Sequence, residues 1–300
     1  MDGLVQWGLE IVRWIQTFRN PVFDQFFLSI NFLGDEEFYL LFFPIVFWCF
    51  SKMLGKRFGV LFLLSLYVNQ FLKDLFAAPR PYQVDSKLYA PAKYTGYGIP
   101  SSHAQGTLTV WGYLATQIKS PVWWIIAVTI PLCVGIGRMY LGDHFPQDVL
   151  LGWALGIVFV AVYVVLQTRV GDWLGQQSMQ MKLVIAVIVP IILAFLHFTL
   201  DTATLLGTML GFYVGLILEE RWIGFDTKTV WWKQVIKLVI GLAVTLGLRF
   251  SLKAILPPIE ISNFVRYGVI GLWISLGAPW VFVKGKLAES VRSKQSTVNS

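Results

Sequence analysis

Long apolar stretches separated by short charged loops are the feature that most restricts the fold of this chain. Nine windows of about 20 residues are apolar enough to cross a lipid bilayer, and the charged residues gather between them. Inside a bilayer every backbone polar group must be bonded within the protein, so these windows indicate helices. Apolar residues make up 56% of the 300 positions and charged residues 14%, which excludes a disordered chain. We predict an all-α, polytopic transmembrane helical bundle.

The predicted spans are bounded by loops rich in charge or proline. They lie at 37–53, 57–76, 103–118, 122–141, 146–168, 182–200, 203–219, 234–252 and 264–283. The span at 103–118 is the least apolar, and its polar residues should face the interior of the bundle. The pairs Gly152-x3-Gly156 and Gly211-x3-Gly215 predict close contact between helices, because small residues let backbones approach one another.

Three regions are expected along the chain. Residues 1–170 form a core that begins with an amphipathic helix at 4–18, which we expect to lie in the membrane interface. A short first span is the alternative for that helix, disfavoured by two charged residues within it. Residues 171–284 form additional transmembrane helices, and residues 285–300 form a cytoplasmic tail that is predicted to be disordered.

The net charge of +7 has two explanations. No basic run alternates with aromatic residues, so we predict no nucleic-acid partner. One side of the bundle collects 14 of the 24 Lys and Arg residues, and basic loops remain in the cytoplasm. The loop 73–103 and the turn 141–146 are therefore predicted to be extracytoplasmic, in a multi-pass protein of the plasma (inner) membrane.

Three short segments carry most of the polar chemistry, and all three fall at one membrane face in this arrangement. Residues 73–81 read KDLFAAPRP, residues 100–103 read PSSH and residues 137–148 read GRMYLGDHFPQD. Singly, each has a structural explanation, because cations at span ends extend to the interface and serines cap helices. Together they bring three cations, two imidazoles, a hydroxyl and a carboxylate to one face, which is what phosphoryl transfer requires.

The cations of these segments are suited to hold a phosphoryl group, whose oxygens carry negative charge during transfer. Lys73, Arg80 and Arg138 are predicted to surround it, the arginines through paired hydrogen bonds. Ser101 and Ser102, with the backbone N–H groups that begin the next helix, are predicted to add hydrogen bonds to the phosphate.

The two histidines, His103 and His144, are the candidates for nucleophile and general acid. Asp148 follows His144 by four residues, so on a helix the two share a face. The carboxylate can then hold one ring nitrogen and leave the other free to attack. Because lysine and arginine supply the positive charge, we predict no metal and no cofactor.

The combined pattern K-x6-RP, PS-x-H and R-x5-H-x3-D resembles the type 2 phosphatidic acid phosphatase (PAP2) superfamily of membrane lipid phosphatases. The resemblance implies that His144 becomes a phosphohistidine held by Asp148, and that His103 protonates the leaving oxygen. It also implies that Lys73, Arg80, Ser101 and Arg138 bind the phosphate. Two positions depart from the family pattern, since Ser102 replaces a glycine and Gly137 replaces a serine.

The site lies at a membrane face, so the predicted partners are membrane lipids and the predicted substrate is a lipid phosphate. Two substrate classes remain open: polyprenyl diphosphates such as undecaprenyl diphosphate, and phosphatidic acid or a sphingoid-type phosphate. The spans after residue 170 resemble the layout of sphingosine-phosphate phosphatase-like members of the superfamily. The alternatives are a phosphotransferase that uses the same site and a non-catalytic lipid-phosphate transporter or scaffold.

A second His-x3-Asp pair occurs at His197 and Asp201. It lacks an arginine six residues earlier, where Ile191 stands. We therefore expect a polar pair at a span end, or the rim of a substrate pocket, and not a second active site.

Overall fold

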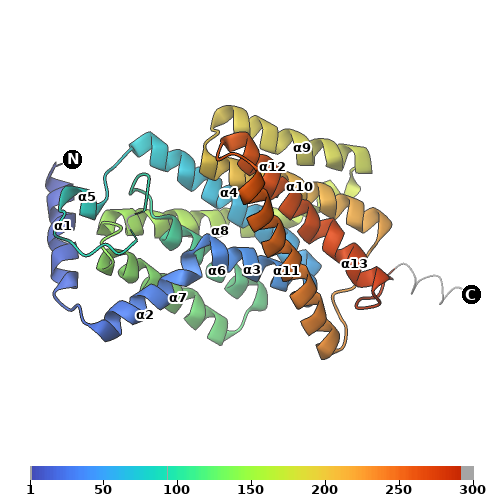
Figure 1. The fold of residues 1–300 in the computed structure, drawn as a ribbon, viewed down its shortest axis with the longest axis horizontal. Coiled ribbons are helices and arrows are strands. Elements are labelled where there is room, and N and C mark those ends of the chain that lie inside the picture. The colour runs from blue at the N-terminus through green and yellow to red at the C-terminus, as the bar shows by residue number, and fades with distance from the viewer. Residues whose placement is uncertain (1, 93, 292–300) are drawn as a thin grey trace, which may run out of the picture. The chain divides into compact units, whose positions relative to one another are not determined.

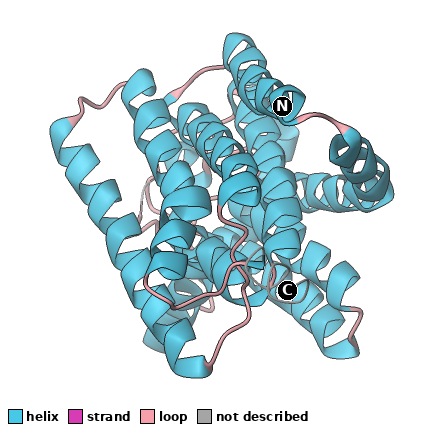
Figure 2. Cartoon of the chain, turned by 90° about the vertical axis from the view of Figure 1, so that its right-hand side faces the viewer, coloured by secondary structure: helices cyan, strands magenta, loops and turns pink. Residues whose placement is uncertain are grey.

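The fold is helical throughout the described residues, 2–92 and 94–291 of a computed structural model (Figures 1 and 2). Within those residues the one extended pairing is an isolated bridge between Phe225 and Ser290. This confirms the predicted all-α class. The long helices begin at residues that suit helix starts, such as the asparagine, serine and threonine caps of α2, α6, α9 and α10, which bond the first free backbone N–H groups.

The helices follow one another in a simple order. They are α1 (Asp2–Gln16), α2 (Pro21–Asn31), η1 (Phe32–Gly34), α3 (Glu36–Ile45), η2 (Val46–Phe50), α4 (Lys52–Phe76), α5 (Pro81–Val84), α6 (Ser102–Ile118), α7 (Pro121–Tyr140), α8 (Pro146–Gln176), α9 (Met179–Leu196), α10 (Leu200–Trp222), α11 (Trp231–Ile255), α12 (Glu260–Leu272), η3 (Trp273–Gly277) and α13 (Ala278–Lys284).

Seven stretches of the described chain are helical, long and apolar enough to cross a membrane. They are Lys52–Val84, Pro121–Tyr140, Pro146–Gln176, Met179–Leu196, Leu200–Trp222, Trp231–Ile255 and Glu260–Lys284. The predicted number of nine is not confirmed. The span expected at 103–118 is the 17-residue helix α6. The span expected at 37–53 is divided between α3, the π-helix η2 and the start of α4. Pro44 lies near the end of α3, and because proline has no backbone N–H it interrupts the regular helical hydrogen bonds there.

The chain separates into two compact units, whose boundaries differ from the expected ones. The first unit holds residues 1–39 and 64–168, and the second holds residues 40–63 and the chain from 169 onward. The expected division at 170 lies close to the boundary found at 168. Residues 40–63, however, were expected in the core and pack with the later helices instead, because Phe43 and Phe47 lie against Phe212 of α10.

In the first unit, small residues and aromatic rings bring the helices together. Helix α7 packs along α6 and α2, and Tyr140 of α7 bonds Asp24 of α2 through its hydroxyl at 2.6 Å. A β-carbon added at Gly152 of α8 would lie 2.7 Å from the carbonyl oxygen of Ser101. This close approach confirms the contact predicted for the pair Gly152-x3-Gly156 and fixes the start of α6 against α8.

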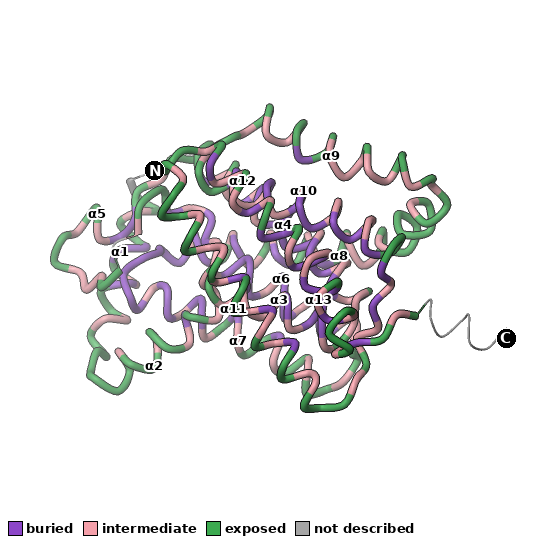
Figure 3. Tube along the Cα trace, turned by 45° about the vertical axis from the view of Figure 1, so that its right-hand side comes forward, coloured by how far each residue is buried: buried purple, intermediate pink, exposed green. Residues whose placement is uncertain are grey.

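In the second unit, α10 packs most extensively on α12. A β-carbon added at Gly211 would overlap the backbone of Gly268, so the other predicted glycine pair also permits close helix contact. Buried positions are drawn purple in Figure 3. Those of the second unit include an aromatic core that contains Trp48. The Trp48 indole donates to the carbonyl oxygen of Ile274 at 2.8 Å, which satisfies a polar group in this core.

Two of the expectations concern the chain ends. In α1, Leu9 and Val12 are buried against Phe145, and Trp7 and Trp14 are exposed. An interfacial position for this amphipathic helix stays a prediction. In the described part of the predicted tail, 285–291, backbone bonds join Val291 to Gly224 and Asp226 to Glu289; the disorder of the tail stays a prediction. The remainder of that tail, 292–300, lies outside the described residues.

A fully buried carboxylate, Glu219, fastens the end of α10. It accepts from the backbone N–H of Phe225 at 2.7 Å and pairs with Lys52 at 2.6 Å. The next residue, Glu220, pairs with Lys56 at 3.2 Å, and both of those side chains are more than a third exposed. The two neighbouring ion pairs therefore differ mainly in burial.

We expect Glu219→Ala to lower the free energy of unfolding by at least about 2 kcal/mol, because it leaves a buried N–H and a lysine without their shared partner. The matched variant Glu220→Ala should change it by less than about 1 kcal/mol, since exposed pairs contribute little. Thermal unfolding in detergent measures both variants. Equal effects of the two would contradict the assigned difference.

Candidate active site

The turn between α7 and α8 places Arg138 beside His144. The backbone N–H groups of Asp143 and His144 both donate to the carbonyl oxygen of Arg138, at 3.0 and 3.2 Å. Gly142 has a φ of 71°, a conformation that other residues adopt at a cost. Asp148 accepts from the N–H of Phe145 at 2.9 Å and so caps the start of α8. The GRMYLGDHFPQD segment thus forms a compact turn that is closed by hydrogen bonds between its own residues.

The hydrogen bonds of His144 determine which of its ring nitrogens carries the proton. Nη1 of Arg80 lies 3.2 Å from Nε2, and a guanidinium can only donate. Nε2 must therefore accept, with its lone pair exposed to that side, and the neutral ring carries its proton on Nδ1. Nδ1 lies 3.4 Å from Oδ2 of Asp148 and has no hydrogen-bond partner among the described residues, so the carboxylate faces Nδ1 at the distance of an ion pair. This is the arrangement of an oriented nucleophile.

Three buried cations surround His144, and the backbone of the loop after α5 engages two of them. Arg80 donates from Nε to the Gly96 carbonyl at 3.0 Å and from Nη1 to the Asp143 carbonyl at 3.1 Å. The Lys73 ammonium donates to the Tyr97 carbonyl at 2.9 Å. These contacts hold Lys73 at the end of α4 and Arg80 at the start of α5.

Arg138 has buried hydrogen-bond donors that are not used within the part of the protein that the structure describes. Its Nη2 lies 3.2 Å from Oδ2 of Asp143, while its Nε and Nη1 are buried without a hydrogen-bond partner. Buried donors without partners are costly, so a bound anion would satisfy them. Burial raises the pKa of the Asp143 carboxyl, against the neighbouring Arg138 and Arg80.

The start of α6 points its backbone at the same place. Ser101 caps the helix, its hydroxyl accepting from the N–H of Ala104 at 3.4 Å, and its own N–H donates to the Asp148 carbonyl at 2.9 Å. A helix N-terminus favours an anion through its free N–H groups and its dipole. Ser102 is the first residue of α6 and is half-buried; the contacts described here do not involve its side chain.

His103 joins the cluster through two partners. Its Nε2 lies 2.8 Å from Oδ1 of Asp35, and its ring meets that of Tyr94 edge to face at 5.9 Å between centroids. The Tyr94 ring also lies under the guanidinium groups of Arg138, at 4.5 Å, and Arg80, at 5.9 Å. One tyrosine thus contacts residues from all three sequence segments, and the predicted site residues other than Ser102 are linked around one point.

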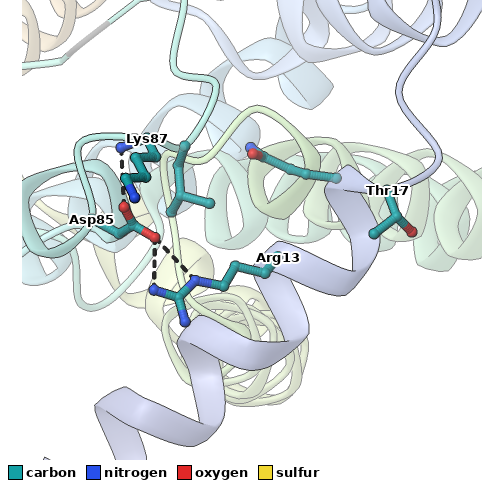
Figure 4. Close-up of a pocket in the computed structure, with 6 residues that line it drawn as sticks. Arg13, Thr17, Asp85 and Lys87 are labelled. Atoms are coloured by element: carbon teal, nitrogen blue, oxygen red, sulfur yellow. Dashed lines mark hydrogen bonds and ion pairs between the residues drawn. The ribbon is translucent and has the colours of Figure 1, made fainter.

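In the part of the chain that the structure describes, no group of three or more His, Cys, Asp or Glu side chains is placed to hold a metal ion. The metal-free reaction stays a prediction. A surface pocket of about 410 Å³ lies apart from the linked residues, beside α1 (Figure 4). There Arg13 pairs with Asp85 at 2.7 Å, which ties α1 to the loop that carries Tyr94.

Comparison with known families agrees with this geometry. Residues 55–172 match the family model described as PAP2 superfamily, and residues 203–290 match a second model, described as PAP2 superfamily phosphatase, transmembrane extension. The two matches together take in about two thirds of the chain. The chain belongs to the PAP2 superfamily.

The PAP2 relatives include named lipid phosphatases. Sphingosine-1-phosphate phosphatase 1 of Mus musculus is 25% identical over 87% of this chain and 72% of that protein. Lipid phosphate phosphatase delta of Arabidopsis thaliana is 26% identical over 57% of this chain and 45% of its own length. Undecaprenyl-diphosphatase of Sulfolobus acidocaldarius is 30% identical over 38% of this chain and 56% of its own. The chain therefore spans about half the length of the last two relatives.

Four residues at this PAP2 site do not belong to the predicted set: Asp35, Asp143, Tyr94 and Asn31. Asp143 lies within the quoted motif, directly before His144, and an acid there is a signal that could have been used. Asp35 opens an acidic run ahead of an apolar stretch, which reads equally well as a helix start. For Tyr94 and Asn31 the sequence offers no signal, since they reach the site through the loop after α5 and through α2.

Asn31 explains the glycine at position 137. A β-carbon there would overlap the amide nitrogen of Asn31, which is buried and donates to the Phe27 carbonyl at 2.7 Å. The space that the usual serine of the family would need is therefore taken by a side chain from α2. The glycine at position 137 and the asparagine at position 31 therefore depend on each other, because the Asn31 side chain occupies the space that a larger residue at 137 would need.

We expect Gly137→Ser to destabilise the protein by about 1–3 kcal/mol, because the serine would overpack against Asn31. Asn31→Ala should make room, so the double variant should be more stable than the sum of the two single changes predicts. Gly171→Ser is the matched control, since a β-carbon there meets no atom within 4 Å. Thermal unfolding measures all four variants, and strictly additive effects would exclude this pairing.

The pH dependence of turnover should reflect the state of His144. Burial, together with Arg80 and Arg138, holds the pKa of His144 well below its usual 6.5. If His144 is the nucleophile predicted from the sequence, the neutral ring is the active form. Activity is then retained above this lowered pKa and lost only as the pH falls through it. We expect the acidic limb of kcat/KM, which reports the free enzyme, to lie below pH 6.5 once the ionisation of the substrate is corrected for. A midpoint at or above 6.5 would contradict this.

Proposed function

We propose that the protein hydrolyses the phosphate ester of a membrane lipid through a phosphohistidine on His144. The observation that carries the proposal is the contact between Arg80 Nη1 and His144 Nε2. It directs a nucleophilic lone pair toward a point bordered by three buried cations and a helix start. A phosphoryl group placed there would replace the nitrogen lone pair as the acceptor for Arg80.

In the first half of the reaction, Nε2 of His144 attacks phosphorus. The N–P bond forms, the ester P–O bond breaks, and its electron pair goes to the lipid oxygen, which takes a proton from His103. Lys73, Arg80 and Arg138 stabilise the charge on the three remaining phosphoryl oxygens. Asp148 faces Nδ1–H and stabilises the positive charge that the ring acquires.

In the second half, water attacks the phosphohistidine. His103 takes a proton from this water, the N–P bond breaks, and its electron pair returns to Nε2 of His144. The products are a lipid alcohol and inorganic phosphate, and both histidines return to their starting states. The cycle needs no group besides water and the side chains named.

The substrate we favour is a sphingoid-type phosphate. The mouse relative named sphingosine-1-phosphate phosphatase 1 aligns over 87% of this chain, whereas the relative named undecaprenyl-diphosphatase aligns over 38%. The first alignment therefore extends beyond the catalytic segment into the later helices. A lipid diphosphate remains the second candidate because its terminal phosphoryl group fits the same cations.

We further propose that the site faces the extracytoplasmic side of a plasma membrane. The support is the concentration of Lys and Arg residues in the loops of the opposite side, since basic loops remain in the cytoplasm. Single cysteines introduced at Lys87 and at Lys228 test this by labelling intact cells with a membrane-impermeant maleimide. Labelling at Lys228→Cys but not at Lys87→Cys would reverse the orientation.

We expect purified protein in detergent to release inorganic phosphate from sphinganine 1-phosphate in the presence of EDTA. His144→Ala should lower kcat by at least about 10³-fold, because it removes the nucleophile. The matched control is His197→Ala, which changes a histidine of the same His-x3-Asp spacing and should leave turnover within about twofold. Phosphate release measured by colorimetry gives the rates.

Each other outcome has a meaning. Unchanged turnover in His144→Ala would refute the phosphohistidine. Phosphate recovered on an added alcohol and not in water would identify a phosphotransferase. Saturable lipid-phosphate binding by the wild type, with no product from monophosphate or diphosphate lipids, would identify a carrier or scaffold.

A further inference from the structure

We propose that Asp35 is a positioning residue for His103, so that the site contains two His–Asp pairs. This inference rests on the proposed function. The first pair, His144 with Asp148, orients the nucleophile; the second, His103 with Asp35, orients the general acid. The observation is the 2.8 Å separation between Nε2 of His103 and Oδ1 of Asp35, two residues that are 68 positions apart in the chain.

The backbone around Asp35 is fixed in a way that suits this role. Asp35 ends the short helix η1, its N–H donating to the Phe32 carbonyl at 3.1 Å, and its carbonyl accepts from the N–H of Tyr39 in α3 at 3.4 Å. The preceding residue must be small, because a β-carbon at Gly34 would lie 2.5 Å from Cδ2 of His103. The imidazole therefore lies directly on the backbone of η1.

The negative charge of Asp35 matters because the other charged groups near His103 are cations. The charged groups that act on His103 are Arg138 of α7 and Lys73 of α4, both cations, and Asp35; the ring of Tyr94 lies against it from the loop. A general acid must hold a proton, and burial together with two nearby cations opposes a protonated imidazole. Asp35 is the neighbouring group that favours the protonated ring, through its charge and its hydrogen bond. Its side chain is 30% exposed against 11% for His103, so the pair is reached by solvent from the Asp35 side.

The geometry also assigns the ring nitrogens. Nε2–H of His103 remains bonded to the Asp35 carboxylate throughout the cycle. Nδ1 is then the nitrogen that gives its proton to the lipid oxygen as the P–O bond breaks, and that takes a proton from water in the second half. Asp35 itself neither gains nor loses a proton. Since kcat/KM reports only the steps up to release of the leaving group, the effect of Asp35 on kcat/KM should appear only where the leaving oxygen needs protonation.

The test compares two substrates that differ in this need. Dodecyl phosphate releases an alkoxide, which requires a proton, and 4-nitrophenyl phosphate releases a stable phenolate, which does not. We expect Asp35→Asn, which keeps the shape of the side chain, to lower kcat/KM for dodecyl phosphate by about 10²-fold. For 4-nitrophenyl phosphate the loss should be less than about threefold. His103→Ala should show the same selectivity, and the double variant should lose little more than either single one.

Controls separate the possible failures. Glu36→Gln changes the neighbouring exposed carboxylate and should affect both substrates by less than about twofold. Should Asp35→Asn fail to fold, as judged by thermal unfolding, Asp35→Glu takes its place, because a displaced carboxylate should still reduce the alkyl substrate selectively. Equal losses on both substrates, or none on either, would overturn the role of Asp35 while the loss of turnover in His144→Ala still upheld the phosphatase. No turnover of any lipid phosphate by the wild type would overturn the proposed function itself.

Discussion

The hydrogen bond between Arg80 and His144 is the interaction on which this account of the site depends. A guanidinium donates and never accepts, so the bond fixes the imidazole as neutral, with its lone pair on Nε2. The same bond brings the connection between α4 and α5 to the turn before α8. Beside this bond, Arg138 pairs with Asp143 but keeps two buried nitrogens without a hydrogen-bond partner in the described chain. A phosphoryl group would accept hydrogen bonds from these nitrogens, and that is why the resting geometry points to phosphate chemistry.

The rest of the first unit holds the side chains of the site in their positions. Helix α1 buries Leu9 and Val12 against Phe145 and thereby supports the turn that presents His144. Helix α2 fills the space at Gly137 through Asn31, and η1 carries Asp35 to His103. The helices that precede the three motif segments are therefore parts of the site. The second unit has its own buried ion pair, Glu219 with Lys52. Its helices also approach one another at glycine residues, as the helices of the first unit do.

The motif residues were predictable from sequence because their spacing has a chemical meaning. A cation at a span end, a capped helix start and a His-x3-Asp pair can each interact with a phosphate. Because all three were predicted at one membrane face, they indicated a single phosphate site. The glycine pairs were predictable for a similar reason, since close helix contact needs small residues. Asp35, Asn31 and Tyr94 were not, because their roles depend on which helix packs beside which, and an acidic helix start or a buried asparagine has many ordinary explanations. The division of 37–53 into α3, η2 and the start of α4 likewise depends on packing around Phe43 and Phe47, which hydropathy does not record.

The most direct measurement is an experimental structure of the protein with orthovanadate, which imitates a phosphoryl group in transfer. The account predicts vanadium bonded to Nε2 of His144, with Arg80 turned from that nitrogen to the vanadate oxygens and with Lys73, Arg138 and the start of α6 completing the shell. Vanadate bound away from His144, or an Arg80–His144 hydrogen bond that persists in the vanadate complex, would contradict it.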